Sequence, residues 1–380
     1  MMRVGIIGTG LVTPLGNTPA GVLAALREGK SALALHPGFP EPYFASLLPR
    51  PVSFEEVSVQ AARAAVQSAG IDTSAPTTGF VLSSIKGDIE HIDKADVSLA
   101  YSAGNIARAL GVSTPPVVVS NACISGLAAL VQGMRMIRSG QYKQVIVVGT
   151  ELQSPFIVTG FQSLKALSVE PCKPFDAQRV GLNLGEASAA IVLSSIPTAE
   201  ENYFLGRCPK NQFSPAIANP THNSSYWELV EGAIRNDANH ISGPSRTGEG
   251  SYNALRAVLP HVDKKDLAFV NVHGTATVYN DEMEAIALSR AGLLDVPVNA
   301  LKGYFGHTMG AAGILESILS MEALEAGVVL STRGFLELGV SAPVQVSAHE
   351  REAHGNAFIK LLSGFGGVNG ALLFRKGGAR

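Results

Sequence analysis

Apolar residues along the chain fall into two kinds of pattern, short unbroken runs and longer stretches with helical spacing. Val117–Val119 is an unbroken β-branched run of the kind found in buried strands. After it, apolar residues recur at helical spacing as far as Ser139-Gly140, namely Leu127, Leu130, Val131, Met134 and Ile137. This order predicts a strand followed directly by a helix, the repeating unit of α/β folds.

Both patterns recur in each half of the chain. In the first half they predict helices over Val57–Gly70 and Ser102–Leu110 and strands over Arg3–Gly8, Gly79–Ser83, Gln144–Glu151 and Ala187–Ser194. In the second half they predict a helix over Ala311–Ala326 and strands over Leu267–Val272, Val296–Leu301, Phe358–Leu362 and Ala371–Phe374. The segment VPVNALKGYFGHTMGAAGILES repeats the order of VVVSNACISGLAAL, which is a strand, a small polar turn and a helix of small residues. A duplicated α/β unit with helix-covered sheets is therefore the simplest architecture.

A polar stretch separates these two sets of elements. Residues 208–225 are rich in Pro, Asn and Ser, which predicts a long loop. We therefore expect two domains, at residues 1–207 and 208–380.

Composition and charge narrow the function. The chain has 380 residues, 46% of them hydrophobic, which suffices for a large buried core, and its net charge of −2 gives no electrostatic basis for nucleic-acid binding. Cys123, Cys172 and Cys208 are spaced too widely for a disulfide framework or a CxxC metal motif. The sequence shows neither a secretory signal nor an apolar run long enough for a membrane helix, so we expect the reducing cytoplasm as its compartment.

Cys123 lies at the predicted turn from strand to helix. A lone cysteine is often only a small buried hydrophobe, and this alternative stays open for Cys123 by itself. The unpaired N–H groups and the positive end of the dipole at a helix start favour a thiolate, however. The position therefore predicts a lowered pKa and suits a nucleophile.

Three further segments carry candidate chemistry. NVHGTATVYNDEMEA places His273 at a strand end, LKGYFGHTMGAAG places Lys302 and His307 before a helix, and LLSGFGGVNGALL is a glycine loop containing Phe365. Taken singly, each histidine is more often a packed or exposed residue, Lys302 a surface charge and Phe365 a core residue. Histidines beside Gly-Thr turns are poor core candidates, however, and a GFGG run lets the backbone approach a ligand closely.

Together with NACISG around Cys123 and PFDAQRVGLNLGEASA at 174–189, these ordered motifs resemble the β-ketoacyl-acyl carrier protein synthases of the thiolase-like superfamily, in their elongating Cys-His-His type. The resemblance covers nearly the whole chain. It implies two βαβαβαββ halves in a five-layer α-β-α-β-α sandwich. It also implies a dimer, either of two copies or with a homologous ketosynthase or chain-length subunit.

The resemblance implies a reaction and a role for each motif residue. Cys123 would take an acyl group from a thioester, with the backbone N–H groups of Cys123 and Phe365 as the oxyanion hole. Malonyl-acyl carrier protein would then lose CO₂, and neutral His273 and His307 would stabilise the enolate that attacks the acyl group, giving a 3-ketoacyl thioester. Lys302 would supply a fixed positive charge. The phosphopantetheine belongs to the carrier protein, so no metal or redox cofactor is expected.

The resemblance also implies supporting residues. Glu316 would pair with Lys302, and Asp281 and Glu284 would support the HGT segment. The pantetheine arm or the substrate would contact Thr275, Thr277, Thr308, Ser363 and Gly366.

Two other classes of related protein are alternatives to an elongating synthase. A non-catalytic chain-length partner commonly lacks the nucleophile that Cys123 supplies. A degradative thiolase needs a second cysteine near the C-terminus, and this chain has none after Cys208.

Three departures from the family pattern indicate a specialised polyketide or polyene pathway. The stretch between Lys86 and Tyr101 is short, and Ser363 stands where the glycine loop usually has a first phenylalanine. The segment at 52–65, which is often basic and docks the carrier, has Glu55, Glu56 and only Arg63.

Overall fold

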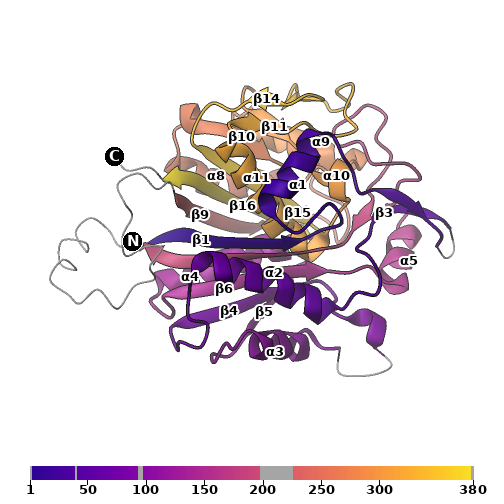
Figure 1. Ribbon diagram of the computed structural model, residues 1–380. Helices are drawn as coiled ribbons and strands as arrows, with labels where there is room; N and C mark the ends of the chain where they lie inside the picture. The colour runs from indigo at the N-terminus through magenta and orange to yellow at the C-terminus, as the bar shows by residue number, and fades with distance from the viewer. Residues whose placement is uncertain (1, 39–40, 93–96, 197–225, 378–380) are drawn as a thin grey trace.

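A computed structural model describes residues 2–38, 41–92, 97–196 and 226–377. Eleven of its strands are hydrogen-bonded side by side in the order β13-β11-β10-β15-β16-β9-β1-β8-β6-β4-β5 (Figure 1). The first half contributes β1 (Arg3–Val12), β4 (Thr78–Ser83), β5 (Val117–Val119), β6 (Gln144–Glu151) and β8 (Ala187–Ile196). The second contributes β9 (Tyr226–Asn236), β10 (Leu267–Asn271), β11 (Pro297–Asn299), β13 (Gln345–Val346), β15 (Ala357–Gly364) and β16 (Val368–Gly377).

The strand order shows that the fold is duplicated. In the first half the strands lie as β1-β8-β6-β4-β5, with β6, β4 and β5 parallel and the other pairs antiparallel. In the second half β9-β16-β15-β10-β11 repeats this order and these directions. The halves join where β1 meets β9, through the pairs Gly5–Glu228 and Ile6–Trp227.

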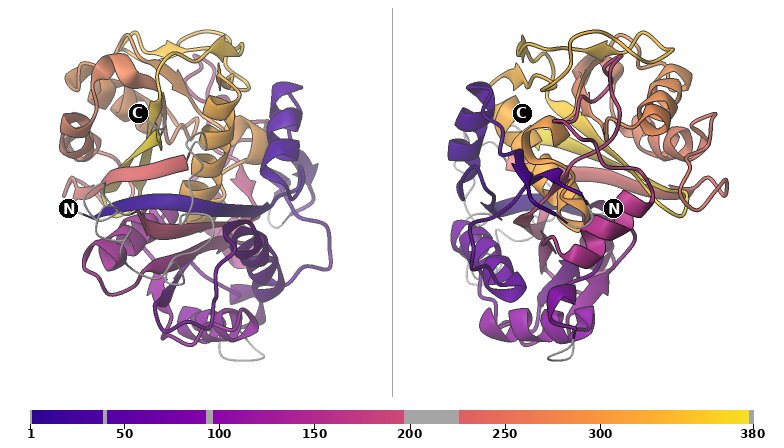
Figure 2. Two further views of the ribbon diagram at one scale, coloured as in Figure 1. Left: turned by 60° about the vertical axis from the view of Figure 1, so that its left-hand side comes forward. Right: turned by 90° about the vertical axis from the view of Figure 1, so that its right-hand side faces the viewer.

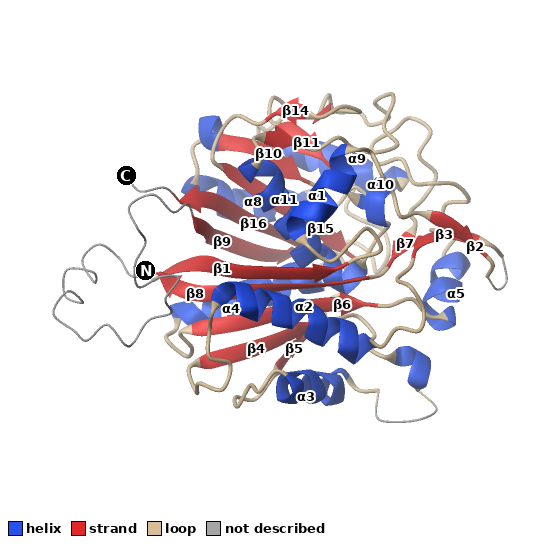
Figure 3. Cartoon of the chain, in the orientation of Figure 1, coloured by secondary structure: helices blue, strands red, loops and turns tan. Residues whose placement is uncertain are grey.

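Helices cover both faces of each half-sheet (Figures 2 and 3). On the outer face of the first half lie α2 (Phe54–Ala69) and α3 (Leu99–Ala109), and on that of the second lie α8 (Glu249–Val258) and α9 (Val278–Arg290). Between the half-sheets lie α4 (Ser125–Arg138) and α11 (Ala312–Glu325), whose apolar residues belong to one core. The layers therefore follow the expected α-β-α-β-α order.

Glycine lets the two central helices meet closely. A Cβ added at Gly313 on α11 would lie 2.3 Å from the backbone nitrogen of Leu127 on α4. Because no side chain fits there, the helix starts approach each other, and the residues just before them share one region of the molecule.

Shorter elements surround these layers. The helices are α1 (Pro19–Arg27), α5 (Pro155–Ser163) and α10 (Lys302–Phe305), and the strands are β2 (Ala34–His36), β3 (Tyr43–Ser46), β7 (Leu184–Gly185), β12 (Val328–Val329) and β14 (Arg351–Glu352). None of the helices in the described part of the chain has the length and apolar character needed to cross a membrane.

The predicted elements are present, with bounds that differ for local reasons. Both outer helices of the first half start three residues early, because the Ser53 and Ser98 side chains accept hydrogen bonds from the backbone and cap them. β1 continues past Gly8 after a register shift. The predicted loop at 208–225, the boundary between 207 and 208, and Cys208 lie outside the described residues, so the domain division stays a prediction.

Candidate active site

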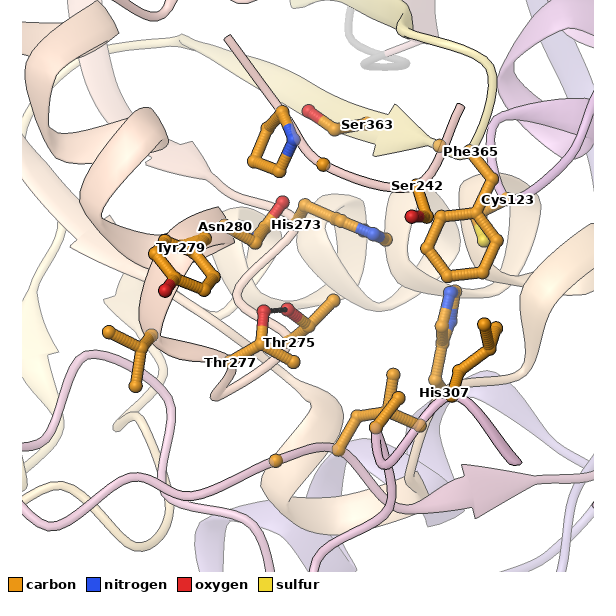
Figure 4. Close-up of a pocket in the computed structure, with 18 of the residues that line it drawn as sticks. Cys123, Ser242, His273, Thr275, Thr277, Tyr279, Asn280, His307, Ser363 and Phe365 are labelled. Atoms are coloured by element: carbon orange, nitrogen blue, oxygen red, sulfur yellow. Dashed lines mark hydrogen bonds between the residues drawn. The ribbon is translucent and has the colours of Figure 1, made fainter. Parts of the chain in front are cut away.

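The predicted site residues come together at the carboxyl ends of parallel strands. Cys123 follows β5, His273 follows β10 and His307 follows β11, and a cavity of about 480 Å³ is lined by all three (Figure 4). Strands β5 and β11 are equivalent in the two halves, so the duplication places Cys123 and His307 opposite each other. This edge of an α/β sheet is where such folds commonly bind ligands.

A strained turn presents Cys123 to the cavity. Ala122 has a φ of +46°, in the left-handed region that side chains rarely adopt. The Ser125 hydroxyl fixes this turn, because it accepts from the Asn121 N–H at 2.7 Å and donates to the Ala122 carbonyl at 2.5 Å. From the glycine loop, Gly364 packs so closely that an added Cβ would lie 3.0 Å from the Cys123 nitrogen.

The surroundings keep the Cys123 thiol protonated. Burial raises its pKa to about 11, and the Lys302 charge and the backbone N–H groups of Phe365 and Cys123 act in the opposite direction. The pKa lowering predicted from the helix start is therefore wrong, because desolvation outweighs the N-terminal field. The two N–H groups that face the sulfur are the pair expected to form an oxyanion hole.

His273 is held through its backbone. Its N–H donates to Glu284 at 2.6 Å, its carbonyl accepts from Lys302 Nζ at 2.6 Å, and the next N–H, of Gly274, donates to Glu284 at 2.8 Å. Asp281, one turn earlier on α9, accepts from the Phe175 N–H at 2.7 Å. Burial raises the pKa of Asp281 to about 6 and, together with the Asp281 charge, that of Glu284 to about 7.

A hydrogen bond to the His307 ring shows which ring nitrogen carries the proton. Its Nδ1 accepts from the Met309 N–H at 3.2 Å, so the neutral ring carries its hydrogen on Nε2. Among the described residues, neither this Nε2 nor the buried Nδ1 of His273 has a hydrogen-bond partner. The rings meet edge to face with centroids 5.0 Å apart.

Both histidines are neutral. Burial lowers the pKa of each well below its ordinary value, and the charges of Lys302 and Lys360 lower both further. One ligand atom each of Cys123, His273 and His307 lies within 4.8 Å of the others. A thiol and two neutral imidazoles can exchange protons and donate hydrogen bonds in one pocket.

Two buried lysines share the Glu316 carboxylate. Lys302 Nζ donates to Glu316 Oε1 at 2.8 Å, as expected from the sequence, and Lys360 Nζ donates to Oε2. A role for Lys360 was not predicted from the sequence. The signal was available, because AFIKLLS has one charge in the middle of an apolar strand.

The residues predicted to contact pantetheine divide into two groups. Thr275, Thr277 and Ser363 line the cavity, with the two threonine hydroxyls 2.9 Å apart (Figure 4). Thr308 and Gly366 are not among the described residues that line it. Thr308 is buried with its methyl group toward Gly185, because the chain turns there into a 3-10 segment, and the Gly366 N–H donates to the Ile241 carbonyl at 2.6 Å. The contact of these two residues with the pantetheine arm or the substrate therefore stays a prediction.

The cavity mouth is apolar. Phe365 is 38% exposed and stacks on Phe161 of α5 at a centroid distance of 6.0 Å. Phe161 was not predicted, and neither were other apolar residues that line the cavity and are exposed: Leu164, Val180, Ile241, Val278 and Tyr279. Ser363, in place of a first aromatic residue, donates to Asn369 Oδ1 at 2.9 Å.

Comparisons with known proteins agree with this geometry. Residues 48–199 match the family model described as beta-ketoacyl synthase, N-terminal domain, and residues 226–336 match its C-terminal domain. The chain is 28% identical to the 3-oxoacyl-[acyl-carrier-protein] synthase 2 of Vibrio cholerae, over 98% of this chain and 99% of that protein.

Two further likenesses extend the comparison. The chain is 31% identical to the tetracenomycin polyketide synthase ketoacyl synthase alpha subunit of Streptomyces glaucescens, over 71% of this chain and 62% of that protein. Among solved structures, a beta-ketoacyl synthase from Burkholderia phymatum STM815 superposes with a TM-score of 0.83 at 26% identity, over 99% of this chain and 100% of that one.

Proposed function

The chain belongs to the β-ketoacyl synthase family, and from that premise we propose that it is a condensing enzyme and acyltransferase that joins an acyl thioester to malonyl-acyl carrier protein. One observation carries the proposal. Cys123, His273 and His307 meet in one cavity, with both imidazoles neutral and with polar atoms free for a substrate.

Acyl loading uses the Cys123 sulfur. A nearby imidazole takes the thiol proton, the sulfur forms a bond to the thioester carbonyl carbon, and the bond to the carrier sulfur breaks. The imidazole then passes that proton to the departing carrier thiolate, which leaves as a thiol. The N–H groups of Cys123 and Phe365 stabilise the tetrahedral oxyanion, because both already face this sulfur.

Condensation uses the two histidines. The malonyl group loses CO₂, and the electron pair of the broken C–C bond becomes an enolate. The N–H groups of His273 and His307 donate to its oxygen, and its carbon attacks the acyl carbonyl on Cys123. A C–C bond forms, and the bond to Cys123 breaks with its electron pair on the sulfur. The released thiolate takes a proton from water, and the 3-ketoacyl product stays on the carrier.

The proposal includes the partner and the setting. Acyl carrier protein brings both substrates on phosphopantetheine, past the apolar mouth and the Thr275–Thr277 pair, and the chain needs no resident cofactor. The relatives' names support 3-oxoacyl-acyl carrier protein or polyketide synthesis, and the alpha subunit in one of them supports assembly with a homologous subunit. The proposal also includes fatty-acid synthesis and a dimer, either of two copies or with that subunit. The free thiols of Cys123 and Cys172 suit a cytoplasmic location.

Intact-protein mass spectrometry tests the proposal. The protein is mixed with acyl carrier thioesters, short to long and saturated to polyunsaturated, beside a Cys123→Ala variant. We expect an acyl-sized mass gain in the native protein that the variant lacks, and the chain that loads best identifies the substrate. No loading from any carrier would reject the condensing activity and favour a non-catalytic chain-length partner.

A further inference from the structure

Lys360 lies where an apolar side chain is expected. Strand β15 is central in its half-sheet, and Phe358 and Leu362, two residues to either side of Lys360, belong to the core that also contains α4 and α11. Side chains two apart share a face of a strand, so Lys360 points into this central layer. It is fully buried. An ammonium in such a place is costly unless charge and hydrogen bonds compensate it.

The partners of Lys360 are the residues that lead into His273. Its Nζ donates to Asn271 Oδ1 at 2.6 Å and to the Val272 carbonyl at 3.2 Å, besides Glu316. Lys302 binds the next carbonyl, that of His273. Two lysines therefore hold three consecutive residues at the end of β10.

The cluster has a net positive charge. Lys302 and Glu316 alone would be a neutral pair, and Lys360 adds one positive charge. The side chains of all three residues are less than 4% exposed. Glu284 on α9 is the other carboxylate whose charge acts on Lys360. Because the interior excludes water, the net positive charge of the cluster disfavours protonation of His273 or His307.

We propose that Lys360 is a positioning residue for the condensation step, because with Lys302 it fixes the backbone that carries His273 and keeps both histidines in their neutral, hydrogen-bond-donating form. This inference rests on the proposed function. Lys360 does not line the cavity among the described residues, so it acts through the histidines and not on the substrate. The Lys360 pKa, lowered by burial to about 8, leaves it charged at neutral pH and below.

The test is the pH profile of CO₂ release from malonyl-acyl carrier protein. In the native enzyme the histidines stay neutral in mild acid, so the midpoint of the acid limb should lie below the ordinary histidine value of about 6.5. Lys360→Gln removes the charge but keeps hydrogen-bond donors. The midpoint of the variant should lie about one pH unit above the native midpoint. At each pH well below both midpoints, the variant should therefore release CO₂ about tenfold more slowly than the native enzyme.

Three controls separate charge from structure. The double variant Lys360→Gln/Glu316→Gln restores the net charge of the cluster, so its midpoint should return toward the native value. Lys376→Gln removes a partly exposed lysine on neighbouring β16 and should leave the profile unchanged. The pH dependence of Cys123 alkylation should also stay unchanged in Lys360→Gln, because Lys302 is the lysine that acts on that sulfur.

The outcomes are distinct. A uniform rate loss with an unmoved midpoint would show that Lys360 is only structural and would overturn the inference. Should neither Lys360→Gln nor Lys360→Met fold, Glu316→Gln decides, because it raises the net charge of the cluster by one. A midpoint below the native one would then support the inference, and an unmoved midpoint would contradict it. A native enzyme that releases no CO₂ at any pH would instead reject the proposed function.

Discussion

Glu316 is the carboxylate that accepts hydrogen bonds from two buried ammonium groups, and its removal should cost much of the stability of the protein. In Glu316→Gln, Lys302 and Lys360 keep their positions but lose the carboxylate that both contact. Breaking a buried ion pair by removing one partner typically costs about 3–5 kcal/mol. A domain has about 5–15 kcal/mol of unfolding free energy, so the loss is large but compatible with folding.

The loss should depend on pH in a definite direction. Burial lowers the Lys360 pKa from 10.5 to about 8 in the native fold, and the Glu316 charge acts to raise it. Without that carboxylate the folded pKa falls further while the unfolded value does not change. The unfolded chain then binds more protons, so the stability of the variant rises with pH as Lys360 discharges. Between pH 6.5 and 8 the gap to the native protein should narrow by roughly 1 kcal/mol.

Guanidinium unfolding at pH 6.5 and pH 8 measures both effects. The matched control is Glu325→Gln on the same helix, because Glu325 pairs with Lys376 at a site about one third exposed. Exposed ion pairs contribute about 0–1 kcal/mol, so this control should lose no more than that. The reasoning fails if Glu316→Gln is no more destabilised than Glu325→Gln, or if its gap to the native protein widens as the pH rises.

Three further predictions concern the reacting groups. His307→Ala should load acyl groups as the native protein does but release CO₂ about 10²–10³-fold more slowly, because one oxyanion donor is lost; unchanged CO₂ release would contradict its role. Iodoacetamide alkylation of Cys123, followed by peptide mass spectrometry, should speed up continuously from pH 7 to 10, because burial raises the thiol pKa to about 11; a plateau below pH 8 would show a thiolate at neutral pH. Gly364→Ala should slow acyl loading about 10²-fold, because its Cβ would displace the Cys123 backbone, whereas Gly104→Ala, where the added Cβ meets nothing within 4 Å, should load normally; equal loading by the two would refute the close packing.

The sequence allowed the architecture to be predicted because apolar runs and helical spacing are local properties. The duplication was visible in the repeated order of strand, polar turn and small-residue helix, and the strand order confirms it. The motifs also identified Cys123, His273 and His307, which line one cavity, and Lys302, which contacts His273. Cys123 and His307 are 184 positions apart in the sequence.

Other properties of the site depend on contacts that the sequence pattern does not contain. The orientation of Thr308 follows from the 3-10 turn after it, which no hydrophobic period indicates. The shift of the Cys123 pKa depends on how many segments exclude water from the sulfur. The sequence shows that Lys360 is charged, but its role depends on its contact with Glu316, which is 44 positions away.

Burial has opposite effects on the acidic and basic members of the site, and this accounts for its resting state. It raises the pKa of the Cys123 thiol and lowers those of the two imidazoles, so all three groups are neutral. A neutral thiol gives up its proton only as a thioester arrives, and acylation then removes the one titratable sulfur. The two histidines are left as neutral donors, which is the form that an enolate requires. The positive charge of Lys302 and Lys360 favours neutral imidazoles in both half-reactions. In the resting enzyme it disfavours protonation of either imidazole. During acyl loading it favours transfer of the proton from the transiently protonated imidazole to the leaving thiolate.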